Sequence, residues 1–141
     1  MKSITIMMFL LLSVLTGSVP SDFEKQTDQT HPFEPCPSSP NCIIHSVEFD
    51  ITEADLFSKA QDVIEIMDPY EFSVDVDSFR IDAVFRIPVF GFKDDVEIVV
   101  QKTADAKSVL HIKSASRVGY GDLGVNSRRV KRFFNNLNEL N

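Results

Sequence analysis

Residues 70–87 read YEFSVDVDSFRIDAVFRI, a run in which apolar and polar side chains alternate. A period of two is typical of β-strands that bury one face, and the polar pair Asp77-Ser78 interrupts the run as a turn would. The stretch therefore predicts an antiparallel hairpin. Pairing Val76 with Phe79 gathers the apolar side chains on one face, and a slip of one residue would scatter them.

Further strands extend this hairpin into a sheet. Apolar residues alternate again over 96–100 and over 110–112, with a turn between them. Pairing Phe85 with Val96 continues the apolar face of the hairpin into the third strand. The segment 47–51 alternates in the same way, and we expect it at an edge of the sheet.

Two amphipathic helices complete the predicted fold. Residues 52–55, TEAD, resemble a capping box, and apolar residues follow at helical spacing over 56–67. The last helix opens after Asp122 or Asn126 and buries the apolar residues of 130–140. The sequence predicts an α+β fold: a two-layer sandwich, with two helices packed on one face of a four- to five-stranded antiparallel sheet. The other sheet face is expected to meet water.

The N-terminal residues have the pattern of a secretory signal. Lys2 precedes an apolar run over 4–15, which is shorter than the roughly 20 residues that span a bilayer. We expect a cleaved signal peptide at 1–18, a flexible polar tether at 19–35 and a single domain at 36–141. The domain would then be periplasmic, lumenal or secreted, and an uncleaved anchor is the alternative.

Charge excludes one class of partner. The formal net charge is -7, and an acidic domain repels the phosphates of nucleic acids. We therefore expect no nucleic-acid partner. We also expect no transmembrane span after cleavage of the signal, and no cofactor. The protein or small-molecule partner stays unknown at this point.

Cys36 and Cys42 are the only cysteines and lie in the sequence CPSSPNC. In an exported chain such a pair predicts a disulfide. The alternative is a metal site formed by both cysteines and His45, completed by His111. Because the spacing fits none of the usual zinc knuckles, we expect no metal.

An acidic cluster lies at the start of the third strand. Asp95 and Glu97 fall on the outer face of the predicted sheet, opposite Arg86 and Lys113. Opposite charges across two strands favour pairing, and exposed pairs of this kind are usually solvated. We interpret these two acids as structural rather than as a site for acid-base chemistry or a hard cation.

Asp94 directly precedes Asp95 on the predicted strand, so its side chain is expected to point to the opposite, helix-covered face, close to Ser114 and Ser116. A buried carboxylate needs a partner. Arg128 or Arg129 of the last helix could supply it, so we expect a structural latch.

The stretch 114–129, SASRVGYGDLGVNSRR, joins the last strand to the last helix. Helix starts attract anions, and glycines let the backbone approach a ligand. We therefore expect a phosphate or carboxylate site. Its candidate residues are Arg117, Gly119, Tyr120, Asp122, Asn126, Arg128 and Arg129. In the structural alternative, the glycines only form the turn and Asp122 or Asn126 caps the helix.

Three motifs in this order resemble the domain of unknown function 1499 (DUF1499) family. They are the two-cysteine segment 36–42, the acidic segment 92–97 that begins at Phe92, and the stretch 114–129. The resemblance covers about the whole mature chain. It implies an exported or lumenal protein and a shared fold, and it implies no particular biochemical activity.

These observations favour a non-catalytic exported domain whose loop 117–126 recognises an anionic group. One alternative is an enzyme that uses Asp94 and Tyr120 in the same cleft, although no histidine forms a recognisable Ser-His-Asp triad. Another is a protein-interaction module that uses the apolar tip Phe90–Phe92. This tip could also dock on a membrane, but we expect it to fold back over the core.

Overall fold

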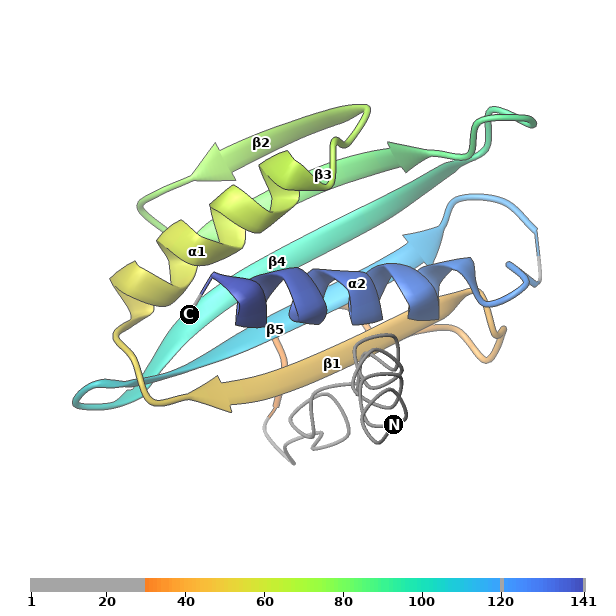
Figure 1. Cartoon of the computed structure of the whole chain (residues 1–141). Helices are drawn as coiled ribbons and strands as arrows, with labels where there is room; N and C mark the ends of the chain where they lie inside the picture. The colour runs from red at the N-terminus through yellow and green to blue at the C-terminus, as the bar shows by residue number, and fades with distance from the viewer. Residues whose placement is uncertain (1–29, 120, 141) are drawn as a thin grey trace, which may run out of the picture.

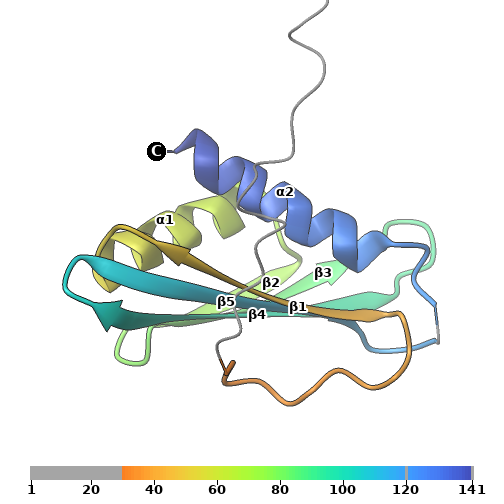
Figure 2. The ribbon, with the colours of Figure 1, turned by 90° about the horizontal axis from the view of Figure 1, so that it is seen from below.

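The computed structural model describes residues 30–119 and 121–140. One antiparallel sheet carries both helices on the same face (Figure 1), and a view along the sheet separates the two layers (Figure 2). The strand order is β1-β5-β4-β3-β2. In chain order the elements are β1 (Cys42–Phe49), α1 (Glu53–Ile66), β2 (Glu71–Asp75), β3 (Arg80–Arg86), β4 (Lys93–Ala104), β5 (Lys107–Ser116) and α2 (Val125–Glu139). The predicted α+β sandwich is confirmed, with five strands.

The core lies between the helices and the sheet. Thr52 caps α1 as predicted, since its hydroxyl accepts a hydrogen bond from the Asp55 amide at 3.2 Å. Leu56 of α1 and Phe133 of α2 are fully buried against the sheet. Leu140 was expected in this core, but it is exposed because α2 ends one residue before it.

Two of the predicted strand registers are confirmed, and one is not. The β2–β3 and β4–β5 pairings agree with the predicted registers. In the β3–β4 pairing, Phe85 lies opposite Asp94 rather than Val96, and Arg86 lies opposite Lys93 rather than Asp95. A shift of two residues leaves every side chain on the same face, so the alternation could not distinguish the two registers.

The outer face of the sheet is partly covered, contrary to expectation. The chain from residue 30 to β1 runs beneath the sheet, on the face opposite the helices (Figure 2). Phe33, which was assigned to the tether, is buried. Lys113 on the outer face donates a hydrogen bond to the Glu34 carbonyl at 2.8 Å.

Residues 1–18 of the expected signal peptide lie outside the described residues, and no helix of the described part is long and apolar enough to cross a membrane.

Cys36 forms a disulfide with Cys42, the first residue of β1, with 5.6 Å between the Cα atoms. We expect that replacing both cysteines by serine lowers the free energy of unfolding by about 2.4 kcal/mol, since the link closes a loop of about seven residues in the unfolded chain. Urea denaturation of the two proteins measures this difference. Thiol counting on the denatured, unreduced wild-type protein should find no free thiol. Two reactive thiols or a stoichiometric metal would contradict the assignment.

Candidate anion-binding site

A buried ion pair ties the last helix to the sheet. Asp94 on β4 is 0% exposed, and its Oδ2 accepts a hydrogen bond from Arg129 Nη2 on α2 at 2.7 Å. The Arg129 guanidinium also lies over the Phe85 ring, 4.9 Å from its centroid. Asp94 therefore points inward and pairs with an arginine of the last helix, as expected. The partner is Arg129 rather than Arg128.

Asn126 in the first turn of α2 connects this latch to the rest of the loop. The side chain is fully buried, and its Oδ1 accepts hydrogen bonds from Ser114 Oγ at 2.6 Å and Arg129 Nη1 at 2.9 Å. Its amide nitrogen, which carries two hydrogens, lies within hydrogen-bond distance of three acceptors: Asp122 Oδ2 (2.6 Å), Ser116 Oγ (2.9 Å) and the Asn41 carbonyl (3.1 Å). These bonds use both polar atoms of the amide group inside the protein, so Asn126 holds the loop.

The start of α2 already carries an anion of its own. The Asp122 carboxylate accepts hydrogen bonds from the Gly124 amide at 2.8 Å and the Asn126 amide at 3.0 Å. Burial by itself would raise the pKa of Asp122, but the hydrogen bonds from the Asn126 side chain and from these amides outweigh it and lower the pKa. Because these amides are bonded, an external anion needs other donors. Asp122 satisfies the helix start, as the structural alternative proposed.

Arg117 lies apart from the other arginines. Its guanidinium pairs with Asp95 on the outer face, with Nη2 at 2.7 Å from Oδ1, and this hydrogen bond raises the pKa of Arg117. The Gly119 carbonyl accepts a hydrogen bond from the Asn41 side chain. Tyr120 lies outside the described residues. The sequence analysis placed these arginines in one site, but the fold places Arg117 on the outer face of the sheet and the arginines of α2 on the helix side.

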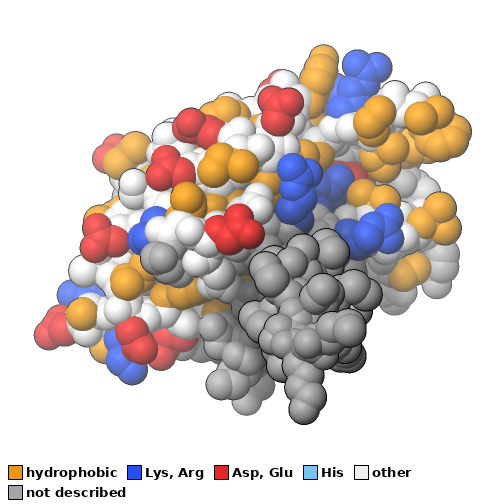
Figure 3. Space-filling view, viewed as in Figure 1, with side chains coloured by type: hydrophobic (Ala, Val, Ile, Leu, Met, Phe, Trp, Pro, Cys, Tyr) orange, Lys and Arg blue, Asp and Glu red, His pale blue; other side chains and the backbone are white. Residues whose placement is uncertain are grey.

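Four arginines line a cleft of about 260 Å³ between the end of α1, β3 and α2. They are Arg86, Arg128, Arg129 and Arg132, and Met67, Phe85 and Val125 complete the lining. In Figure 3, Lys and Arg side chains gather over α2 and beside the β3–β4 loop. Arg128 Nη1 donates to the Leu123 carbonyl at 2.7 Å. The exposed Arg132 side chain has no hydrogen bond or ion pair among the described residues.

Sequence reasoning missed Arg86 and Arg132. Arg86 was assigned to an ion pair across the strands, and Arg132 was not among the candidate residues. The signal for Arg132 is its spacing, because residues four apart on a helix share a face and Arg128 precedes it by four. No comparable signal marks Arg86, since its neighbours in the cleft come from helices distant in the sequence.

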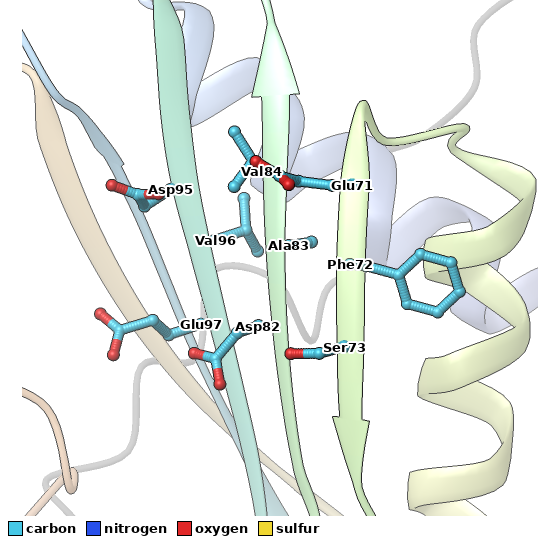
Figure 4. A pocket seen from close by; sticks show the side chains of 9 residues that line it. All are labelled: Glu71, Phe72, Ser73, Asp82, Ala83, Val84, Asp95, Val96 and Glu97. Carbon is cyan, nitrogen blue, oxygen red and sulfur yellow. The ribbon is translucent and has the colours of Figure 1, made fainter.

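A larger hollow, of about 410 Å³, lies elsewhere, on the outer face of β2, β3 and β4. Figure 4 shows Glu71, Asp82, Asp95 and Glu97 on these neighbouring strands. Arg80 bridges two of these acids, 2.7 Å from Asp82 and 2.6 Å from Glu97, and the hydrogen bond to Asp82 is the largest cause that raises the pKa of Arg80. No group of His, Cys, Asp and Glu in the described part could hold a metal ion. The paired charges favour a structural role for this groove.

A smaller hollow of about 270 Å³ lies between the β3–β4 and β5–α2 loops. Asp94, Ser116 and Asp122 line it, together with the apolar Ile87, Phe92 and Val118 and two glycines. Asp94 Oδ1 is buried without a hydrogen-bond partner among the described residues. The catalytic alternative needs Tyr120 in this hollow, so it stays a prediction.

His111 is buried on the outer face with both ring nitrogens bonded. Its Nε2 lies 2.9 Å from the Gln101 side-chain oxygen and therefore donates, which leaves Nδ1 to accept from the Ser46 hydroxyl at 2.7 Å. Burial first, and then the charge of His31, lower the pKa of His111 below 6.5. With both cysteines in a disulfide and this ring fully bonded, the residues of the alternative metal site have other partners.

We expect acid to destabilise the protein through His111. Because its folded-state pKa lies below the unfolded value, the unfolded chain takes up the proton first as the pH falls. Stability is therefore complete above about pH 6.5 and decreases below it. Thermal unfolding between about pH 7.5 and about pH 5.5 should show a smaller decrease for His111→Gln. His45, whose pKa burial also lowers, keeps part of the slope. An identical slope in His111→Gln would contradict this account.

The family is decided by sequence similarity over the folded part. The sequence profile described as "Protein of unknown function (DUF1499)" matches residues 32–137. The chain belongs to this family. The resemblance carried by the three motifs is thereby confirmed, and no curated protein matches the sequence significantly.

One solved structure with a similar fold is the di-domain ARO/CYC protein BexL from the BE-7585A biosynthetic pathway. The superposition has a TM-score of 0.53 at 11% sequence identity, and it covers 70% of this chain and 46% of that chain. The present chain thus spans less than half of the length of BexL. At this identity the likeness shows a shared fold alone.

Proposed function

We propose that this protein is an exported, non-catalytic domain that binds an anionic group, a phosphate or a carboxylate, in the arginine cleft between β3 and α2. The observation that carries the proposal is the cleft itself. Four guanidinium groups line it on a chain of net charge -7, and Arg132 has no partner among the described residues.

The arginines suit this role by their geometry. A guanidinium group offers five donors in a planar fork that matches carboxylate and phosphate oxygens. Arg129 is held in place by Asp94, Ser114 and Asn126, so it forms a fixed wall of the cleft. Like charges that converge in one cleft repel one another, and a bound anion removes that repulsion.

Two glycines leave room for two of these guanidinium groups. Gly91 has φ +67°, and a Cβ there would lie 3.3 Å from Arg86 Nη2. Gly124 has φ +77°, and a Cβ there would lie 3.0 Å from Arg128 Nη1. Glycine adopts positive φ without strain and adds no side chain that would displace the arginine. The glycines thus support the proposal by accommodating arginine side chains.

Export is supported by the signal-like residues 1–18 and by the Cys36–Cys42 disulfide, since disulfides persist in oxidising compartments. The anion site would then meet ligands of the periplasm, of an organelle lumen or of the exterior.

We expect inorganic phosphate or citrate to raise the melting temperature of the wild-type protein at constant ionic strength, because ligand that binds only the folded state stabilises it. Arg128→Ala and Arg132→Ala should each remove most of this rise, with their own melting temperatures little changed. Arg117→Ala is the matched control, since it removes an exposed arginine on the other face. Differential scanning fluorimetry across a ligand series measures all four proteins. A rise that persists in Arg132→Ala, or that disappears equally in Arg117→Ala, would refute the site.

A further inference from the structure

We propose that the end of the molecule formed by the β3–β4 and β5–α2 loops docks on a membrane surface rich in anionic lipid. The apolar loop tips would enter the headgroup layer while the arginine cleft binds a lipid phosphate. The inference rests on the proposed function and names the lipid headgroup as the source of the anion.

Both loops present apolar side chains to solvent at the same end of the molecule. The loops lie side by side beyond the sheet in both ribbon views (Figure 1, Figure 2), and hydrophobic side chains cover this end in the space-filling view (Figure 3). Leu123 is 94% exposed, Val89 84% and Phe90 73%. The Phe90 ring stacks on Phe92 at 5.7 Å and does not fold back over the core, contrary to expectation. Exposed apolar clusters of this kind mark interaction surfaces.

Basic residues surround these tips. The segments 86–93 and 117–132 hold two and five of the chain's 14 lysines and arginines, which is half of the total. The same segments hold one of the 21 acidic residues, Asp122, and two of their seven basic residues, Arg117 and Arg129, are paired with Asp95 and Asp94 of β4. The other five basic residues of these segments outnumber Asp122. The rest of the chain is strongly acidic. An anionic surface therefore attracts this end and repels the opposite one, which orients the molecule.

The combination of exposed apolar side chains and neighbouring guanidinium groups favours a membrane, rather than a groove on another protein, as the docking partner. The apolar side chains stand at the apices of two protruding loops, and guanidinium groups line the adjacent cleft. Apolar side chains beside basic ones are the pattern that binds a lipid interface, where the former enter the acyl boundary and the latter meet phosphates. The hollow between the loops is lined in part by the apolar Ile87, Phe92 and Val118, which would continue the apolar surface.

The chain contains no tryptophan, so a single introduced tryptophan reports on its own surroundings. Phe90→Trp places the probe at the β3–β4 tip. Val76→Trp is the matched control, because Val76 is 65% exposed in the turn between β2 and β3 at the other end of the sheet. Because the probes are local, any binding through the N-terminal apolar residues affects both proteins alike. The probe membranes are vesicles of phosphatidylglycerol and phosphatidylcholine in equal parts, and of phosphatidylcholine alone, each with and without brominated acyl chains.

We expect the emission of Phe90→Trp to shift to shorter wavelength with anionic vesicles and to be quenched by brominated chains, while Val76→Trp stays unchanged. Arg132→Ala in the Phe90→Trp background should weaken vesicle binding about fivefold, the effect of one basic residue at an anionic surface. Leu123→Ser in the same background should weaken it about tenfold or more, because the apolar side chain at the tip is removed without a change of charge. Leu123→Ser should keep the melting-temperature rise with inorganic phosphate.

The outcomes separate this inference from the proposed function. Unchanged Phe90→Trp emission with anionic vesicles, together with an Arg132-dependent rise in melting temperature with phosphate, would overturn membrane docking and leave the anion site standing. Equal insertion into neutral and anionic vesicles, unaffected by Arg132→Ala, would overturn headgroup binding in the cleft. Absence of an Arg132-dependent rise in melting temperature with phosphate would overturn the proposed function itself. A spectral shift that follows protein concentration without lipid would identify a second copy of this chain as the occupant and would also overturn the proposal.

Discussion

Asp94→Ala should lower the free energy of unfolding by about 3–5 kcal/mol, the largest single effect that we expect outside the apolar core. The substitution leaves the Arg129 guanidinium, whose side chain is 10% exposed, without its carboxylate partner. Removal of one member of a buried ion pair has an effect of this size because the remaining charge is desolvated and uncompensated. Urea denaturation with the slope fixed by the wild type measures it.

Asp95→Ala is the matched control, because Asp95 is the next residue on β4 and its ion pair with Arg117 is exposed. It should change stability by less than about 1 kcal/mol. Similar losses for the two aspartates would mean that β4 presents the wrong face to the helices. The double variant Asp94→Leu, Arg129→Met should recover most of the loss, since apolar residues of similar volume often replace a buried pair without penalty.

Asn126→Ala should lower the free energy of unfolding by about 3 kcal/mol. The change removes one hydrogen-bond partner each from Ser114 Oγ and the Asn41 carbonyl, both in buried residues, and from the half-buried Ser116 Oγ. Each buried group left unsatisfied costs about 1–3 kcal/mol, and part of the network can rearrange. Chemical denaturation and the melting temperature both report the loss.

Asn135→Ala on the same helix serves as the control, since Asn135 is exposed. Its effect should stay within about 0.5 kcal/mol. If Asn126→Ala were equally mild, the side chain would not hold the loop, and Asn126 would return to the candidates for ligand binding.

The periodicity of the sequence was enough to predict the layers of the fold. Alternation over 70–87 and helical spacing over 56–67 reflect which side chains the core buries, so they determine both element type and facing. The β3–β4 register was beyond this reasoning, because Phe85 opposite Asp94 and Phe85 opposite Val96 expose the same faces. The covering of the outer face depends on Phe33, whose neighbours in sequence are polar and give no periodic signal.

The position of a candidate residue could be predicted where the alternation of side chains along a strand is enough to assign its face. Asp94 could be assigned to the helix side because its neighbours on β4 alternate, and it is buried there. The sequence could not predict that Arg117 lies on a different face from the arginines of α2. The direction of its side chain depends on where β5 ends and where the loop bends. Asn126 and Arg86 acquire their neighbours only through tertiary contacts, Asn126 with Ser114 and Arg86 with the residues of α2.

The buried Asp94–Arg129 ion pair and the arginine cleft share a residue, Arg129. Arg129 bonds Asp94 and the Asn126 oxygen through different nitrogens, and it lines the cleft beside Arg128 and Arg132. The buried network thus fixes the first turns of α2, and with them the spacing of the guanidinium groups. We expect weakened anion binding in any variant that loosens this network without unfolding the protein.

The most direct test of the anion site is a titration of the isotope-labelled protein with inorganic phosphate, followed by ¹H–¹⁵N correlation spectra that include the arginine Nε–H signals. The cleft predicts saturable shifts of the Arg86, Arg128 and Arg132 Nε–H signals and of the amides in the first turns of α2. The Arg80 signal on the outer face, whose guanidinium already bridges Asp82 and Glu97, should stay unchanged. Shifts centred on Arg80 or Arg117, or none that saturate, would contradict the account.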